Sequence, residues 1–308
     1  MKNFSELGLS EAVAIAIAEL GFEKPTPIQS QVIPAMLESA KDLIALAQTG
    51  TGKTAAFGIP LVELIDTSAK KPQALVLAPT RELCVQIEND LKAFSAKTKH
   101  FYTVAVYGGA NIRTQIDQLR KGVQVVVATP GRLIDLLGRR AVDLSQIKYL
   151  VLDEADEMLN MGFQEDIDEI LSTTPKEKVT WLFSATMPTE IKSISKKYMK
   201  SPMEISAGNV NQTNANIEHQ YYLVQPKNKY AALKRILDYN PDIYGIIFCR
   251  TKAETQEIAE KLIKDGYNAD SLHGDLSQMQ RDKVMLAFRE RTLQMLIATD
   301  VAARGIDI

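Results

Sequence analysis

One glycine-rich run has the residue types and spacing that bind phosphate. It follows a short apolar run and precedes a helical pattern. A glycine-rich turn between a strand and a helix aims backbone N–H groups at phosphate oxygens, and the helix adds its positive N-terminal end. Lys53 would then reach the β- and γ-phosphates of a nucleotide, and the Thr54 hydroxyl would bind magnesium. The predicted loop comprises Gln48, Thr49, Gly50, Thr51, Gly52, Lys53 and Thr54.

Two acidic residues supply the carboxylates that such a loop needs. Asp153 and Glu154 directly follow the apolar run at 149–152. Parallel sheets place ligands at the carboxyl ends of their strands, so Asp153 is expected to hold the magnesium, directly or through water, and Glu154 to orient or deprotonate the attacking water. The alternative is an acidic helix start that only satisfies the helix dipole. Ala47, which stands where the usual pattern has its first glycine, matters only if that position needs a positive φ.

The elements that must position these residues alternate between strand and helix. Continuous apolar, β-branched runs are typical of parallel strands covered on both faces by helices. The first part of the chain is therefore predicted to be a doubly wound α/β domain. Its predicted strands are 43–47, 74–78, 102–107, 123–128, 149–153 and 179–184.

A second α/β unit is predicted after a polar stretch. The pattern lapses in an Asn-rich segment, so we expect a domain at 1–207, a linker at 208–216 and a second domain at 217–308. The second domain is short for its type and is expected to be incomplete. Its predicted strands are 221–224, 245–249 and 294–298, with helices near 227–238, 252–265 and 277–289.

Composition places the chain among ordinary globular proteins. It has 308 residues, 45% hydrophobic, with a formal net charge of −2. These values exclude a disordered tail, a coiled-coil rod and a polycation that binds nucleic acid by bulk charge alone. Cys84 and Cys249 lack the spacing of a zinc site or a disulfide framework and are expected to be buried. No apolar run is long enough for a membrane span, so we expect a cytoplasmic monomer.

Read together with the phosphate loop, the tetrad Asp153-Glu154-Ala155-Asp156 resembles the DEAD-box RNA helicases, which are named for it. The run at 21–29 looks like the family's Q motif, with Phe4 at the position of its upstream aromatic. The resemblance implies two RecA-like domains in tandem, with ATP and Mg²⁺ as cofactors. It also implies adenine recognition by an amide that donates and accepts at once and by a stacked aromatic. The residues that the resemblance assigns to nucleotide binding here are Phe4, Phe22, Thr26 and Gln29.

Further motifs imply RNA contacts. Three groups follow predicted strands, and their hydroxyls, glycine amides and arginines suit a sugar-phosphate backbone. Each taken alone is equally an N-capped helix start. By resemblance the second domain adds RNA contacts, for which a surface ion pair is the alternative at the two arginines, and a contact of Asp307 with the nucleotide ribose. The implied RNA-binding residues are Pro79, Thr80, Arg81, Gly108, Gly109, Thr129, Pro130, Arg132, Arg281, Thr299 and Arg304.

Ser184 and Thr186 match the family motif that couples hydrolysis to strand separation, although two hydroxyls there could simply cap the next helix. The family's next motif, which carries an arginine finger, is absent because the chain ends at Ile308. Such a finger is worth about 10³- to 10⁵-fold in rate, so the chain alone is expected to be impaired as an ATPase. The resemblance thus implies an ATP-dependent RNA helicase. An ATP-gated RNA clamp without turnover and a DNA motor remain alternatives.

Overall fold

The computed structural model describes residues 3–48, 50–207 and 217–299. The chain divides into two compact units, residues 1–212 and 213–308. The predicted linker at 208–216 lies outside the described residues. So do three of the predicted site residues, which are Thr49, Arg304 and Asp307.

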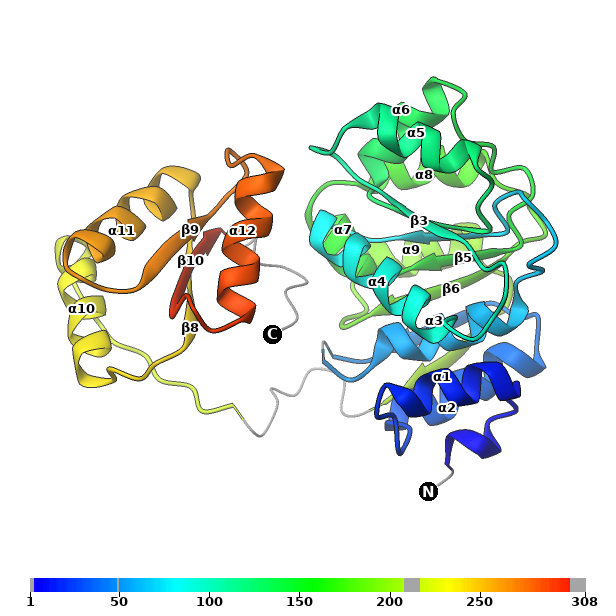
Figure 1. The fold of residues 1–308 in the computed structure, drawn as a ribbon, viewed down its shortest axis with the longest axis horizontal. Coiled ribbons are helices and arrows are strands. Elements are labelled where there is room, and N and C mark those ends of the chain that lie inside the picture. Colours follow the sequence, from blue (N-terminus) through cyan, green and yellow to red (C-terminus); the bar gives the residue numbers. More distant parts are fainter. Residues whose placement is uncertain (1–2, 49, 208–216, 300–308) are drawn as a thin grey trace. The chain divides into compact units, whose positions relative to one another are not determined.

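The first unit is built on a seven-stranded parallel sheet (Figure 1). The strand order is β3-β4-β2-β5-β6-β1-β7, and every neighbouring pair is parallel. Most of these strands are short apolar runs that are buried over nearly their whole length, as helices on both faces require. The strands are β1 (Leu43–Leu46), β2 (Ala74–Leu77), β3 (Thr103–Val106), β4 (Val125–Ala128), β5 (Tyr149–Leu152), β6 (Val179–Ser184) and β7 (Met203–Ser206).

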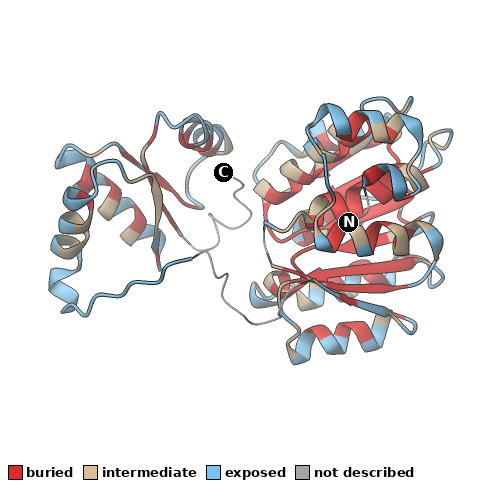
Figure 2. Ribbon diagram, turned by 90° about the horizontal axis from the view of Figure 1, so that it is seen from below, coloured by how far each residue is buried: buried red, intermediate tan, exposed pale blue. Residues whose placement is uncertain are grey.

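Helices cover both faces of this sheet, and each face has its own core (Figure 2). Side chains of α1 to α4 pack on one face and side chains of α5 to α9 on the other. Successive residues of a strand alternate between the cores: Val76 packs in the first, and Leu75 and Leu77 in the second. The helices are α1 (Glu11–Glu19), α2 (Pro27–Glu38), α3 (Lys53–Leu64), α4 (Arg81–Phe94), α5 (Ile112–Arg120), α6 (Pro130–Gly138), α7 (Ala155–Asn160), α8 (Gln164–Ser172) and α9 (Thr189–Tyr198), with a short 3₁₀ turn η1 (Phe4–Glu6).

The second unit has a three-stranded parallel sheet in the order β8-β10-β9 within the part of the chain that the structure describes. Together with the first unit, it confirms the predicted fold class of two parallel-sheet α/β units. Its elements are β8 (Gly245–Cys249), β9 (Ala269–Leu272) and β10 (Met295–Thr299), with η2 (Pro226–Asn228), α10 (Lys229–Tyr239), α11 (Lys252–Lys264) and α12 (Gln278–Arg289).

The strand predicted at 221–224 was wrong. These residues carry no strand, and they are exposed, with Tyr221 at 86% and Leu223 at 92%. A β-prone run becomes a strand only beside a hydrogen-bonding neighbour, and no described strand pairs with this one. Two other strands, β7 and β9, were missed because their sequences, Met-Glu-Ile-Ser and Ala-Asp-Ser-Leu, mix polar and apolar residues.

Both cysteines are buried, as predicted, and burial raises the pKa of the Cys84 thiol well above its ordinary value. Neither forms a disulfide. Among the helices in the described ranges, none is both long and apolar enough to cross a membrane.

Candidate nucleotide and RNA site

The glycine-rich loop joins β1 to α3, at the carboxyl edge of the sheet, and α2 braces it from the side. The Thr26 hydroxyl donates to the Thr51 carbonyl oxygen at 2.9 Å, and Nε2 of Gln29 donates to the Gly52 carbonyl oxygen at 3.1 Å. The Thr51 hydroxyl donates to the carbonyl of Gln48 at 2.7 Å. These bonds tie the described residues of the loop to the start of α2 and to one another.

Gly52 is required by its backbone and by its surroundings. It precedes α3 with φ +87°, in the left-handed region, and an added Cβ would lie 2.3 Å from Nε2 of Gln29. Ala47 has no positive φ, so the missing first glycine of the usual pattern costs nothing here.

We expect Gly52→Ala to destabilise the first unit by about 2 kcal/mol, roughly half from the left-handed φ and half from the displaced Gln29 amide. The matched control is Gly8→Ala, because Gly8 has φ +80° with nothing within 4 Å of its Cβ position. That variant should lose only about 1 kcal/mol. Urea unfolding of both, followed by the single tryptophan, Trp181, measures the difference, and equal losses would contradict the proposed brace.

Two of the predicted nucleotide-binding residues, Thr26 and Gln29, lie beside this loop. Gln29 is 3% exposed, and its Oε1 accepts from the Thr26 N–H at 2.9 Å, which completes a capping box on α2. The Phe4 and Phe22 rings meet edge to face with centroids 5.8 Å apart. Both atoms of the Gln29 amide therefore already have protein partners, so adenine recognition by this amide stays a prediction.

A buried cation and two buried carboxylates meet next to the loop. Lys53 opens α3, while Asp153 and Glu154 follow β5, and all three are less than 9% exposed. Oδ1 of Asp153 accepts from the Glu154 N–H at 3.0 Å. Glu154 has φ 48° and ψ 50°, a left-handed conformation that is rare for a residue with a side chain. Backbone strain of this kind clusters at functional sites.

Burial sets the protonation of this acid pair. It raises the pKa of Asp153 to about 6, although the positive charge of Lys53 opposes the shift. Burial and then the negative charge of Asp153 raise the pKa of Glu154 to about 7. A carboxylate with a pKa near neutrality is suited to accept a proton from water.

Oxygen donors at this site suit a magnesium ion. Asp153 offers a buried carboxylate and Thr54 a hydroxyl, which are hard ligands of the kind that Mg²⁺ prefers. Within the described ranges no three His, Cys, Asp or Glu side chains cluster to hold a metal. An ion held here would therefore complete its shell with water and phosphate oxygens, as Mg²⁺ commonly does.

The raised pKa of Glu154 predicts a pH-dependent stability. The folded state holds this proton more tightly than the unfolded state, so stability falls as the pH rises from about 4.5 to about 7. Glu154→Gln removes the buried charge. We expect the variant to exceed the parent by about 2 kcal/mol at pH 8.5, measured with EDTA and without nucleotide, and to match it below pH 4.5. If the unfolding free energies of the parent and the variant changed with pH in parallel across this range, the raised pKa of Glu154 would be contradicted.

Asp156 connects the tetrad to the predicted coupling residues. Its Oδ2 accepts from the Thr186 N–H at 3.0 Å and from the Thr186 hydroxyl at 2.7 Å. The Ser184 hydroxyl donates to the Thr186 carbonyl oxygen at 2.6 Å. Neither hydroxyl caps α9, whose N-cap is Pro188, so the alternative of a simple helix cap was wrong. Sequence reasoning named the tetrad but gave Asp156 no role, although its place there was the available signal.

The predicted RNA-binding residues of the first unit share one edge of the sheet. They follow β2, β3 and β4, which are neighbours in the strand order. The Thr80 hydroxyl caps α4 through the Leu83 N–H, as the alternative reading proposed, whereas Thr129 makes no such cap on α6. Pro79 is buried before this cap, and Pro130 is the first residue of α6.

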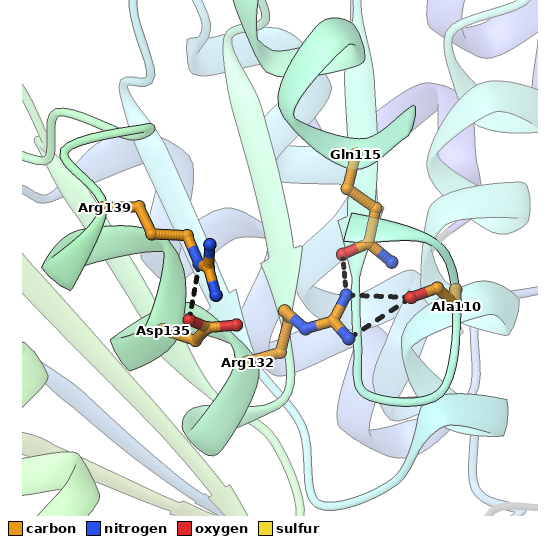
Figure 3. Close-up of polar contacts among 5 residues, drawn as sticks. All are labelled: Ala110, Gln115, Arg132, Asp135 and Arg139. Carbon is orange, nitrogen blue, oxygen red and sulfur yellow. Dashed lines mark hydrogen bonds and ion pairs between the residues drawn. The ribbon is translucent and has the colours of Figure 1, made fainter. Parts of the chain in front are cut away.

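Two arginines bracket the glycine loop after β3. Gly109 has φ +87°, and a Cβ there would lie 2.2 Å from Nη1 of Arg81, so the guanidinium lies close against the loop. Gly108 lies beside the same side chain. From α6, Nη1 and Nη2 of Arg132 both donate to the Ala110 carbonyl oxygen at 3.3 Å (Figure 3). The loop is thus contacted by Arg81 and bonded to Arg132.

In the second unit, two predicted RNA-binding residues are described. Arg281 lies on α12 and is 5% exposed, and Thr299 ends β10. Arg281 is therefore buried, and its RNA contact stays a prediction.

The fold and the site together are typical of one class of protein. A parallel sheet carries at its carboxyl edge a glycine turn opening a helix, an acidic pair after another strand and a row of polar loops, as in P-loop nucleotide-binding proteins. The DEAD/DEAH box helicase family model matches residues 26–194, and the helicase conserved C-terminal domain model matches residues 228–308. The chain belongs to the DEAD/DEAH box helicase family.

Curated relatives match over the whole chain. It is 48% identical to the ATP-dependent RNA helicase CshA of Limosilactobacillus reuteri, covering 99% of this chain and 61% of that protein. It is 46% identical to the ATP-dependent RNA helicase DeaD of Mycobacterium tuberculosis, covering 99% and 54%. The chain thus spans about three fifths of the length of the curated relatives it matches.

Solved structures of two related proteins are similar to this chain. A DEAD box protein from the hyperthermophile Methanococcus jannaschii is 46% identical with a TM-score of 0.65, covering 99% of this chain and 82% of that chain. Dbp5 of S. cerevisiae bound to RNA and ADP BeF3 is 32% identical with a TM-score of 0.90, covering 100% and 78%.

Proposed function

We propose that the chain is the ATP- and RNA-binding part of an ATP-dependent RNA helicase that separates short duplexes. The observation that carries this proposal is the buried set Lys53, Asp153 and Glu154 beside a braced glycine loop. The activity named for its CshA and DeaD relatives supports the same assignment. ATP, Mg²⁺ and RNA are the proposed ligands.

In the proposed reaction, the loop's backbone N–H groups and Lys53 bind the phosphates of ATP. Thr54 and Asp153 would hold Mg²⁺, which would neutralise charge that develops on the transferred phosphoryl group. Glu154 orients the attacking water and accepts its proton, a role for which its pKa of about 7 is suited. Gln29 and Phe22 select the adenine.

RNA would bind along the carboxyl edge formed by β2, β3 and β4. The donors there are arginine side chains, hydroxyls and glycine N–H groups, which suit phosphates and 2′-hydroxyls and not base edges. We therefore propose little sequence preference. Asp156 and its two hydrogen bonds from Thr186 would pass the state of the nucleotide site to neighbouring segments, which is the proposed coupling.

A second candidate is an ATP-gated RNA clamp that binds both ligands without turnover. The candidate phosphate-binding residues all belong to the first unit, and a clamp would use them for binding alone. Phosphate release with and without RNA separates the two functions, because turnover above the no-protein background is incompatible with the clamp. Equal stimulation by RNA and DNA strands of the same length would instead indicate a DNA motor.

A further inference from the structure

A buried glutamine on α5 joins two loops of the proposed RNA edge. Gln115 is 4% exposed. Its Nε2 donates to the Tyr107 carbonyl oxygen at 3.1 Å. Its Oε1 accepts from Nη1 of Arg132 at 2.8 Å (Figure 3). Because the donor and the acceptor of the amide are both used, Gln115 links the end of β3 to the first turn of α6.

Arg132 keeps donors for a ligand after making these bonds. A guanidinium has five N–H donors. Three of them serve the protein, one to Gln115 and two to Ala110. The Nε–H and the second Nη2–H have no protein partner among the described residues. The residue as a whole is half-buried, so it is not sealed from solvent.

A second buried glutamine shows what a purely structural role looks like. Gln124 is 1% exposed and lies at the opposite, amino edge of the same sheet. Its amide bonds only to backbone groups, accepting from the Tyr102 N–H and donating to the carbonyl oxygens of Ala69 and His100. Gln115 differs because its acceptor oxygen binds a charged side chain at the edge where RNA is proposed to lie.

We propose that Gln115 is a positioning residue for RNA binding. It holds Arg132 and the loop at 108–110 in one arrangement, so that the remaining guanidinium donors and the loop N–H groups meet RNA phosphates without prior reordering. Ordering a long side chain on binding weakens affinity, and Gln115 orders Arg132 before RNA arrives. This inference rests on the proposed function and assigns Gln115 no part in nucleotide binding.

The test is a double-mutant cycle on RNA affinity. Gln115→Met, Arg132→Gln and the double variant are compared by binding of fluorescent oligo(U) with a non-hydrolysable ATP analogue and magnesium. We expect each single variant to weaken RNA binding roughly three- to tenfold. The double variant should lose less affinity than the sum of the two single losses, because part of the effect of Gln115 passes through Arg132. Affinity for the ATP analogue should stay that of the parent.

Two matched controls separate positioning from folding. Gln124→Met should lower the unfolding midpoint and leave RNA affinity unchanged, and Gln118→Met, on the exposed side of α5, should change neither. If Gln115→Met does not fold, Arg132→Lys tests the same link, since an ammonium cannot bridge the two acceptors as the fork does. It should also weaken RNA binding.

The outcomes are distinguishable. Parent-like RNA affinity in Gln115→Met or in Arg132→Lys, or losses that add in the double variant, would overturn the positioning role while leaving RNA binding intact. Absence of RNA binding by the parent, with the ATP analogue bound, would overturn the proposed function and this inference with it.

Discussion

Replacing Glu154 by glutamine is expected to leave ATP binding near that of the parent and to lower its turnover at least a hundredfold. Glutamine keeps the size of the side chain, but its amide cannot accept a proton from water, and general-base catalysis contributes about 10²- to 10⁴-fold. Binding should survive because the residues proposed to hold the phosphates, such as Lys53, are unchanged. Steady-state phosphate release and titration with a fluorescent ATP analogue measure the two quantities on one preparation.

The control for this variant is Glu157→Gln on α7, which removes a neighbouring carboxylate that has no proposed part in catalysis. Its turnover should stay within about threefold of the parent's. A Glu154→Gln protein that hydrolyses ATP like the parent would remove Glu154 from its proposed role. Loss of ATP binding in the same variant would show that Glu154 acts in binding instead.

Removing the cation of Lys53 should weaken nucleotide binding by at least a hundredfold. Lys53 is 7% exposed, and its charge opposes the upward pKa shifts of Asp153 and Glu154. Lys53→Ala therefore removes the cation that binds the phosphates and leaves the acid pair without its positive neighbour. Removing one partner of a buried, hydrogen-bonded charge pair between a protein and its ligand costs about 2–5 kcal/mol of binding free energy, and a hundredfold loss corresponds to about 2.7 kcal/mol.

The matched control is Lys252→Ala, because Lys252 also opens a helix, α11, but is exposed and pairs with Asp275 at 2.7 Å. It should bind the ATP analogue like the parent. Calorimetric titration in magnesium compares the two variants. Binding by Lys53→Ala within threefold of the parent would show that the loop holds phosphates through backbone groups alone.

Apolar runs in the sequence predicted most of the first unit. The strand at Val179–Ser184 has the predicted bounds, because its apolar run is buried over its whole length in the sheet. In the second unit, the strand at Gly245–Cys249 also has the predicted bounds, although only Cys249 is fully buried there. Strands whose formation depends on a neighbouring strand were harder to predict from the sequence. The segment at 221–224 looks like a strand but pairs with no described strand, and β9 is a strand although half its residues are polar.

The candidate site was predictable where it follows strand ends and less so where side chains meet. Motif spacing placed Lys53 and Asp153 at the same edge, and the structure brings them together. The link from Asp156 to Thr186 joins residues 30 positions apart, and the link from Gln115 to Arg132 joins residues 17 apart. Hydrophobic periodicity predicts which face of an element a residue occupies but not which polar partner it contacts, so these two hydrogen-bonded links could not be predicted from the sequence.

The most direct test of the account is RNA-stimulated ATP hydrolysis. Phosphate release is measured in magnesium, with and without poly(U) RNA, for the 308-residue chain and for a form extended past Ile308 with the corresponding segment of a CshA relative. The account predicts that RNA raises turnover in the extended form and that Glu154→Gln abolishes the increase. If both forms bind ATP and RNA changes the turnover of neither, the coupling of nucleotide and RNA sites is contradicted.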